Sequence, residues 1–174
     1  MKKVIAIVVL VLSINQVFCQ EKNVFDIARK GTLAEIQNLY KKQPEVINTI
    51  NESKSNPLIL ACYRNNEEVA LFLIDKVKDI NYNSGMGTAL MAGVMSGNIA
   101  IVKKLIASKA DLNQGDTYNK TALIYAAFFN KNEIAKLLIE AGADKNLKDS
   151  DGKTALDFAN FNKNTELIIL LDKQ

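Results

Sequence analysis

The feature that most constrains the fold of this chain is a tripeptide that recurs at a fixed interval. Thr-Ala-Leu begins at Thr88, Thr121 and Thr154, so consecutive copies are 33 residues apart. One interval earlier, Asn-Pro-Leu at 56–58 fills the same place, 32 residues before Thr88. Self-similarity at a period of about 20–50 residues is typical of repeat architectures. The sequence therefore predicts a solenoid in which each unit packs on its neighbours.

A recurring asparagine locates one shortened unit. It follows each predicted pair of helices, at Asn48, Asn81, Asn113 and Asn146. The two series of intervals together place a one-residue deletion between Asn81 and Thr88. Gly85 and Gly87 lie in this stretch, and glycine tolerates the positive φ angles that a tightened turn needs.

Each unit has the local chemistry of two helices separated by a break. We expect short inner helices at about 57–64, 89–96, 122–129 and 155–162. A side-chain oxygen can cap each of them, from Asn56, Thr88, Thr121 and Thr154. The breaks fall at Asn65, Gly97, Asn130 and Lys163, and asparagine and glycine suit the left-handed conformation that ends a helix. A longer outer helix follows, for example Glu133 to Ala141, with apolar residues at helical spacing.

These patterns predict an all-α solenoid of five units. Residues 23–45 look like a degenerate first unit that serves as a cap, and the last unit ends in an apolar helix from Leu167 to Leu171. The units span about 23–48, 49–81, 82–114, 115–147 and 148–174. Five units exceed the roughly three that such a fold needs for stability.

The units resemble ankyrin repeats over residues 23–173. The resemblance is carried by Thr121-Ala122-Leu123, Ala126-Ala127, Leu137-Leu138 and Ala141-Gly142-Ala143-Asp144, which recur in phase in the units before and after. It implies helix–turn–helix units with projecting turns, inner helices that line a concave groove, and a non-catalytic role in binding proteins. The chain departs from the family where a histidine usually follows the tripeptide, at Ile59, Met91, Ile124 and Asp157. We interpret the apolar replacements as packing residues.

The N-terminus has the layout of a secretory signal peptide. Lys2 and Lys3 precede an apolar run from Val4 to Leu12. This run is too short to span a bilayer, which takes about 20 residues. We expect residues 1–19 to be cleaved after Cys19, so that residues 20–174 form the mature ankyrin repeat domain. The protein would then be exported, to the periplasm or the medium, and of bacterial origin. In the alternative, Cys19 carries a lipid anchor. Phe18 disfavours this, because lipoprotein processing needs a small residue just before the cysteine.

Charge and composition exclude several classes of function. Without the two lysines of residues 1–19, the 22 basic side chains become 20 against 19 acidic ones, a net charge of +1. Such a surface predicts no binding to nucleic acid and no attachment to anionic membranes. The chain has no histidine, which excludes Ser-His-Asp or Cys-His catalysis and histidine zinc sites. Cys62 is then a lone cysteine, which we expect to be buried and inert.

Aromatic residues on the inner helices are the candidate binding residues. In the register of the repeats, Phe128 aligns with Tyr63, Met95 and Phe161, and Tyr125 aligns with Leu60, Ala92 and Phe158. Phe129 follows, and Tyr118 lies in the preceding turn. We expect a partner-binding ladder of Tyr63, Met95, Tyr118, Tyr125, Phe128, Phe129 and Phe161, because aromatic residues dominate interface hot spots. In the alternative, these rings pack against one another and little of them is exposed.

The aspartates of the turns are weak candidates for a metal site or a catalytic site. Asp116, Asp149 and Asp151 are typical of turns, where the carboxylate accepts hydrogen bonds from backbone N–H groups. We expect no metal and no cofactor.

The leading hypothesis is a monomeric, non-catalytic module that holds a protein partner in its groove, as an inhibitor or protector of an envelope or secreted protein. The alternatives are a self-associating structural protein and an enzyme with Asp149 and Asp151 as its carboxylate pair.

Overall fold

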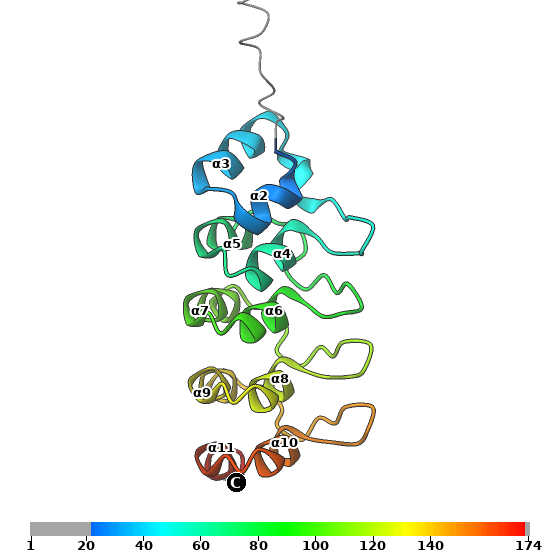
Figure 1. The fold of residues 1–174 in the computed structure, drawn as a ribbon, viewed down its shortest axis with the longest axis vertical. Helices are drawn as coiled ribbons and strands as arrows, with labels where there is room; N and C mark the ends of the chain where they lie inside the picture. The colour runs from blue at the N-terminus through cyan, green and yellow to red at the C-terminus, as the bar shows by residue number, and fades with distance from the viewer. Residues whose placement is uncertain (1–21, 173–174) are drawn as a thin grey trace, which may run out of the picture.

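A computed structural model describes residues 22–172 of the protein, so the expected signal peptide at 1–19, with Cys19, lies outside the described residues. Helices come in pairs that stack along one axis (Figure 1). The pairs are α2 (Val24–Lys30) with α3 (Leu33–Lys42), α4 (Pro57–Tyr63) with α5 (Glu67–Ile74), α6 (Ala89–Ser96) with α7 (Ile99–Ala107), α8 (Ala122–Phe128) with α9 (Asn132–Glu140), and α10 (Ala155–Phe161) with α11 (Thr165–Asp172). A 3-10 helix, η1 (Pro44–Asn48), follows α3. This arrangement confirms the predicted all-α solenoid.

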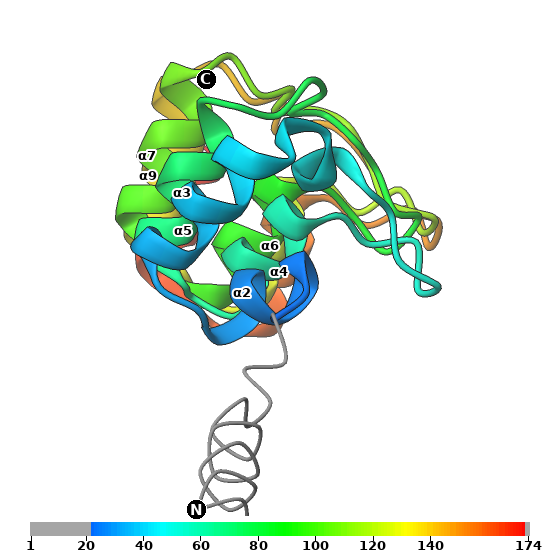
Figure 2. The ribbon, with the colours of Figure 1, turned by 90° about the horizontal axis from the view of Figure 1, so that it is seen from above.

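The two helices of each pair occupy different layers. Seen along the stack, α3, α5, α7 and α9 lie on one side, while α2, α4 and α6 lie next to the projecting turns (Figure 2). Both layers contribute to one continuous core, with Leu58, Leu90 and Leu123 from inner helices and Leu73 and Leu105 from outer ones. Within residues 22–172, no helix combines the length and apolar character needed to cross a bilayer.

Helix ends follow the local chemistry of the repeat. Asn56 Oδ1 accepts the Ile59 N–H at 2.8 Å, and Thr88, Thr121 and Thr154 cap the next three inner helices in the same way. All four predicted breaks adopt positive φ, with values of 57° at Asn65, 75° at Gly97, 55° at Asn130 and 55° at Lys163. Lysine is an uncommon residue in this conformation, yet Lys54 and Lys109 adopt it as well, with φ values of 58° and 64°.

The turn of the third unit is one residue shorter than the others. Its closing hydrogen bond joins Ser84 N–H to the Gly87 carbonyl, whereas those of the other units span 51–55, 116–120 and 149–153. Gly85 and Gly87 have φ values of 85° and 126°. A side chain at either position would be strained. The deletion predicted from the repeat intervals therefore lies in this turn.

The positions that hold histidine in typical ankyrin repeats are filled in two ways. Ile59, Met91 and Ile124 are at most 8% exposed, which confirms their packing role. Asp157 is exposed and instead accepts the Thr154 N–H at 2.8 Å, completing a capping box. Cys62 is fully buried, and burial raises the pKa of its thiol, so this side chain stays protonated.

Neighbouring units are joined by the recurring asparagine. Asn48 Oδ1 accepts the Lys78 N–H at 2.9 Å, and Asn81 and Asn113 accept the N–H groups of Asp111 and Asp144 at 2.8 Å. Each bond links the end of one unit to the end of the next. Side-chain acceptors thus satisfy backbone donors that the helices leave unpaired.

The projecting turns are also joined to one another. The Thr117 N–H donates to the Gly85 carbonyl and the Ser150 N–H donates to the Tyr118 carbonyl, both at 2.9 Å. Asn83 Nδ2 adds a bond to the Gly115 carbonyl at 2.9 Å. Without the family histidines, the turn row is therefore still linked by backbone and asparagine hydrogen bonds.

Removing one of the asparagine links tests their contribution. We expect Asn81→Ala to lower the free energy of unfolding by about 0.5–1.5 kcal/mol, because the Asp111 N–H loses its acceptor. Asn81→Asp keeps an acceptor oxygen and should retain most of that stability. Urea denaturation followed by circular dichroism measures both variants, and equal stability of Asn81→Ala and the wild type would contradict a role for the bond.

Candidate functional site

The aromatic side chains gather where α8 and α10 meet the projecting turns. Phe128 lies edge-to-face against Phe129, with ring centroids 4.9 Å apart, and edge-to-face against Phe158, at 5.6 Å. Tyr125 stacks on Phe129 at 6.2 Å. We refer to Tyr125, Phe128, Phe129 and Phe158 as the aromatic cluster. These rings pack against one another within and between units, as the alternative reading of the sequence expected.

Packing leaves much of this surface accessible. Phe128 is 46% exposed and Phe129 is 40% exposed, although each contacts two other rings. Phe161 is 84% exposed, and Tyr63 and Tyr118 are exposed as well. Met95 and Tyr125 are half-buried. The face thus combines mutual ring packing with several accessible apolar side chains.

Two hollows indent this face at different heights of the stack. The first, of about 280 Å³, lies between the second and third units and is lined by Ile59, Leu60, Tyr63, Met86, Ala92 and Met95, with small polar groups around them. The second, of about 330 Å³, lies between the fourth and fifth units and is lined by Phe128, Phe158, Phe161, Lys153 and Asp157. The predicted residues Tyr63 and Met95 therefore belong to one hollow, and Phe128 and Phe161 to the other.

Two residues of this face were missed by the sequence analysis. Met86 lies at the tip of the shortened turn and is 78% exposed. It aligns with Tyr118 once the one-residue deletion is taken into account, so the repeat register could have found it. Phe158 aligns with Tyr125 and closes the second hollow against Phe128. Its packing across two units has no signal in the sequence of either unit alone.

Tyr125 differs from its neighbours because its hydroxyl group is already used. The hydroxyl donates to Asp116 Oδ2 at 2.6 Å. Burial raises the pKa of Tyr125, and the hydrogen bond to the Asp116 carboxylate raises it further. The phenol therefore remains a neutral donor that fixes the turn beneath Tyr118.

The aspartate carboxylates of the turns accept hydrogen bonds from the backbone. Asp116 Oδ1 accepts the N–H groups of Tyr118 and Lys120, and Asp149 Oδ1 accepts those of Asp151 and Lys153, at 2.8–3.0 Å. Asp149 is only 4% exposed. A carboxylate held in this way is poorly placed to exchange protons with a substrate, which removes the basis for the pair of Asp149 and Asp151 as catalytic groups. Within residues 22–172, no group of acidic or cysteine side chains could hold a metal ion.

Asp149 lacks the partner that Asp116 has. Phe158 stands where Tyr125 stands one unit earlier, so no hydroxyl reaches Asp149. Within the described residues, Asp149 Oδ2 accepts no well-directed hydrogen bond, and the Lys120 ammonium lies 3.3 Å away. The ion pair with Lys120 therefore compensates this oxygen, where Asp116 Oδ2 has a short hydrogen bond from a hydroxyl group. The comparison of the two units thus identifies a position where a hydroxyl donor can be added.

Exchanging the two rings tests this comparison. Phe158→Tyr should raise the free energy of unfolding by about 1 kcal/mol, because its hydroxyl can donate to Asp149 Oδ2. Tyr125→Phe should lower it by about 1.5–3 kcal/mol, because a hydrogen bond to a carboxylate is lost. Urea denaturation of the two variants measures both effects. A destabilised Phe158→Tyr would show that the ring packing against Phe128 does not tolerate the hydroxyl.

The same carboxylate makes stability depend on pH. Burial disfavours the charged form of Asp149, but the Lys153 N–H, the Lys120 ammonium and the Asp151 N–H outweigh it and hold the pKa below its ordinary value of 3.8. The pKa of Asp157 is also lowered, chiefly by the Thr154 N–H. The unfolded chain then binds protons more readily than the folded one as the pH falls, so these groups stabilise the fold above pH 3.8 and cease to do so below it.

We therefore expect stability to be nearly constant between about pH 7 and pH 5 and to fall below that as the carboxylates gain protons. Asp149→Asn should make the fall shallower, because asparagine keeps the Oδ1 acceptor and does not titrate. Asn51 already fills this place in the second unit, where it accepts the Ser55 N–H at 2.9 Å. Urea midpoints measured from pH 7 to pH 3 provide the test, and identical slopes for both proteins would contradict it.

Comparisons with known proteins agree with this architecture. A family model of ankyrin repeats (3 copies) matches residues 24–116 and residues 90–174. A similar curated protein is the ankyrin repeat domain-containing protein SAT10 of Stachybotrys chartarum (strain CBS 109288 / IBT 7711), 28% identical over 101 residues. That alignment covers 58% of this chain and 5% of the relative, so it spans a small part of a much longer protein. The chain belongs to the ankyrin repeat family, and its repeats indicate a protein–protein interaction module.

Proposed function

We propose that the protein binds another protein on the face where its inner helices meet the projecting turns. The supporting observation is the run of accessible apolar side chains there, from Met86 and Tyr63 to Phe161, around the two hollows. Large contiguous apolar patches on soluble proteins are typical of interaction sites. Isolated exposed residues would need no such explanation, but these residues lie on successive units of one face.

The physical basis of binding is burial of aromatic area on a surface that is already ordered. Phe128 and Phe129 are held by ring contacts on two sides, so little side-chain entropy remains to be lost when a partner covers them. Preorganisation of this kind improves affinity by lowering the cost of association. Phe161, with 84% of its surface exposed, gains most from burial and is the expected hot spot.

The proposed place of action is outside the cytoplasm of a bacterial cell. Lys2, Lys3 and the apolar run from Val4 to Leu12 support export through a cleaved signal peptide. A binding module in that location would hold an envelope or secreted protein, which it inhibits or protects. This role extends the proposed binding function by analogy with the fold.

A recovery experiment in the native host tests binding and export together. The full chain is produced there with a C-terminal tag, beside a Tyr118→Ala/Phe161→Ala variant and an Ile169→Ala control, which truncates an exposed apolar side chain on α11. After cross-linking, each is recovered from the envelope and secreted fractions. We expect one partner protein with the wild type and the control, and at least tenfold less of it with the double variant. The first residue of the recovered protein should be Gln20.

Other outcomes would separate the parts of the proposal. Equal recovery of a partner by all three proteins would exclude the aromatic face as the binding site. Recovery of only a second copy of the chain would favour self-association instead. A protein that retains its first 19 residues inside the cell would contradict export and leave the binding face to be tested on its own. Circular dichroism of each variant verifies that the fold is intact.

A further inference from the structure

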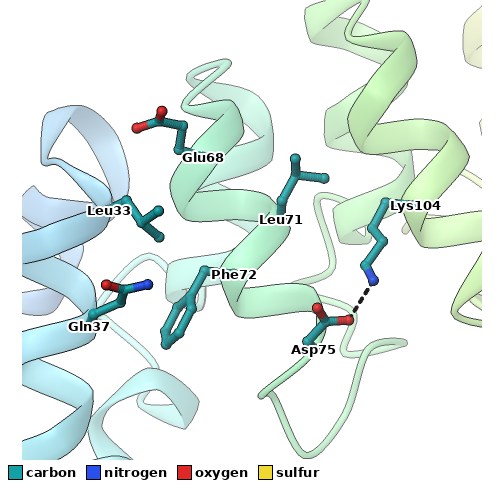
Figure 3. A pocket seen from close by; sticks show the side chains of 7 residues that line it. All are labelled: Leu33, Gln37, Glu68, Leu71, Phe72, Asp75 and Lys104. Carbon is teal, nitrogen blue, oxygen red and sulfur yellow. Dashed lines mark ion pairs between the residues drawn. The ribbon is translucent and has the colours of Figure 1, made fainter.

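The outer helices carry a hollow that the proposed function does not use. It has a volume of about 480 Å³ and lies over α5, between α3 and α7. Leu33, Leu71 and Phe72 provide its apolar surface, and Glu68, Asp75 and Lys104 lie around it. Figure 3 shows Leu33 reaching from α3 on one side of α5 and Lys104 from α7 on the other. These helices form the layer remote from the projecting turns (Figure 2).

The other units act as internal controls for this surface. Leu71 aligns with Asn38 in the preceding outer helix, with Lys103 and Lys136 in the two that follow, and with Ile169 in the last. Lys103 and Lys136 are exposed, so the position faces solvent and the fold accepts a charge there. Core packing therefore does not require leucine at this position. Leu71 also lies in one hollow with Leu33 and Phe72, and grouped apolar side chains at the surface are typical of interaction sites.

The apolar floor of the hollow is fixed in position. Phe72 lies edge-to-face against Tyr40 of α3, with ring centroids 5.6 Å apart and an interplanar angle of 82°. Leu71, Phe72 and Leu33 are each partly buried against the core and partly accessible. The hollow is thus built by contacts between units and does not arise from one unit alone.

The charges around the hollow are unbalanced. Asp75 pairs with the Lys104 ammonium at 2.7 Å. Glu67, the first residue of α5, also has a partner, because its carboxylate accepts a hydrogen bond from Asn98 Nδ2 at 2.8 Å. Glu68 is exposed and, within residues 22–172, has neither an ion pair nor a side-chain hydrogen bond. One uncompensated carboxylate therefore borders an apolar hollow.

We propose that this hollow binds a segment of a partner protein that presents a large apolar side chain with a lysine or arginine close to it. The apolar side chain covers Leu71 and Phe72, and the cation pairs with Glu68. Arginine and aromatic residues are enriched in protein interfaces for these two purposes. A segment in this hollow leaves the aromatic face free, so the module can contact two proteins at once.

Selection from a phage-displayed library of random 12-residue peptides tests the proposal with the purified full chain. Leu71→Lys gives the second unit the lysine that the next two units already carry, and Ile169→Lys is the matched control at the same register position in α11. We expect enriched peptides that combine a large apolar residue with lysine or arginine. Their binding should be at least tenfold weaker for Leu71→Lys and unchanged for Ile169→Lys. Glu68→Gln should weaken it about two- to fivefold, as loss of an exposed ion pair does.

Several results would overturn the proposal. One is that no peptide is enriched. Another is that the enriched peptides bind the Leu71→Lys variant as tightly as the wild type. A third is that the enriched peptides lack a basic residue and bind equally well after Glu68→Gln. Dimerisation that Leu71→Lys abolishes, measured by sedimentation, would assign the hollow to a second copy of the chain. None of these results depends on Tyr118 or Phe161, so they do not test whether the aromatic face binds a partner. If Leu71→Lys failed to fold, Glu68→Gln would still report on the same site.

Discussion

The hydrogen bond from one asparagine side chain to the backbone of the next unit sets the geometry on which the rest of this solenoid depends. Apolar burial supplies the driving force for stacking, but it is not directional and permits small shifts between neighbouring units. Asn48, Asn81 and Asn113 each accept one N–H group at 2.8–2.9 Å, which fixes the register. Columns of equivalent residues therefore lie in line across the first four units. Asn164 Nδ2 joins the fifth unit to the fourth by donating to Asn130 Oδ1 and Asn132 Oδ1 at 2.8 Å. The aromatic face and the outer hollow both lie between units aligned in this way.

Much of the fold follows from local chemistry, which is why the sequence predicts it well. Side-chain caps, left-handed breaks and the shortened turn each involve a few adjacent residues, and the deletion before Thr88 is visible as a change of interval. Contacts between units are less accessible to such reasoning. The packing of Phe128 on Phe158, and of Tyr40 on Phe72, depends on side-chain directions in two neighbouring units. The sequence gives the alignment of these residues but not the angle at which their rings meet.

The aromatic residues show why packing and exposure are not exclusive alternatives. A ring on an inner helix has one edge toward the next unit and one face toward solvent, so Phe128 contacts two rings and still exposes 46% of its surface. Tyr125 lies at the other extreme, since its hydroxyl is committed to Asp116. Within one inner helix, therefore, some residues mainly stabilise the stack and others mainly present area to a partner.

A repeat protein allows this distinction to be made from a single chain, because each unit is a control for the others. A position that is apolar and buried in several units, such as that of Ile59, Met91 and Ile124, is explained by packing. A position that is polar in three units but apolar in others, such as Leu71 beside Asn38, Lys103 and Lys136 with Ile169 in the last unit, is not required to be apolar by packing. The departure of a unit from those on either side is thus a physical reason to look for a partner where, as at Leu71, it coincides with a hollow and an unpaired carboxylate.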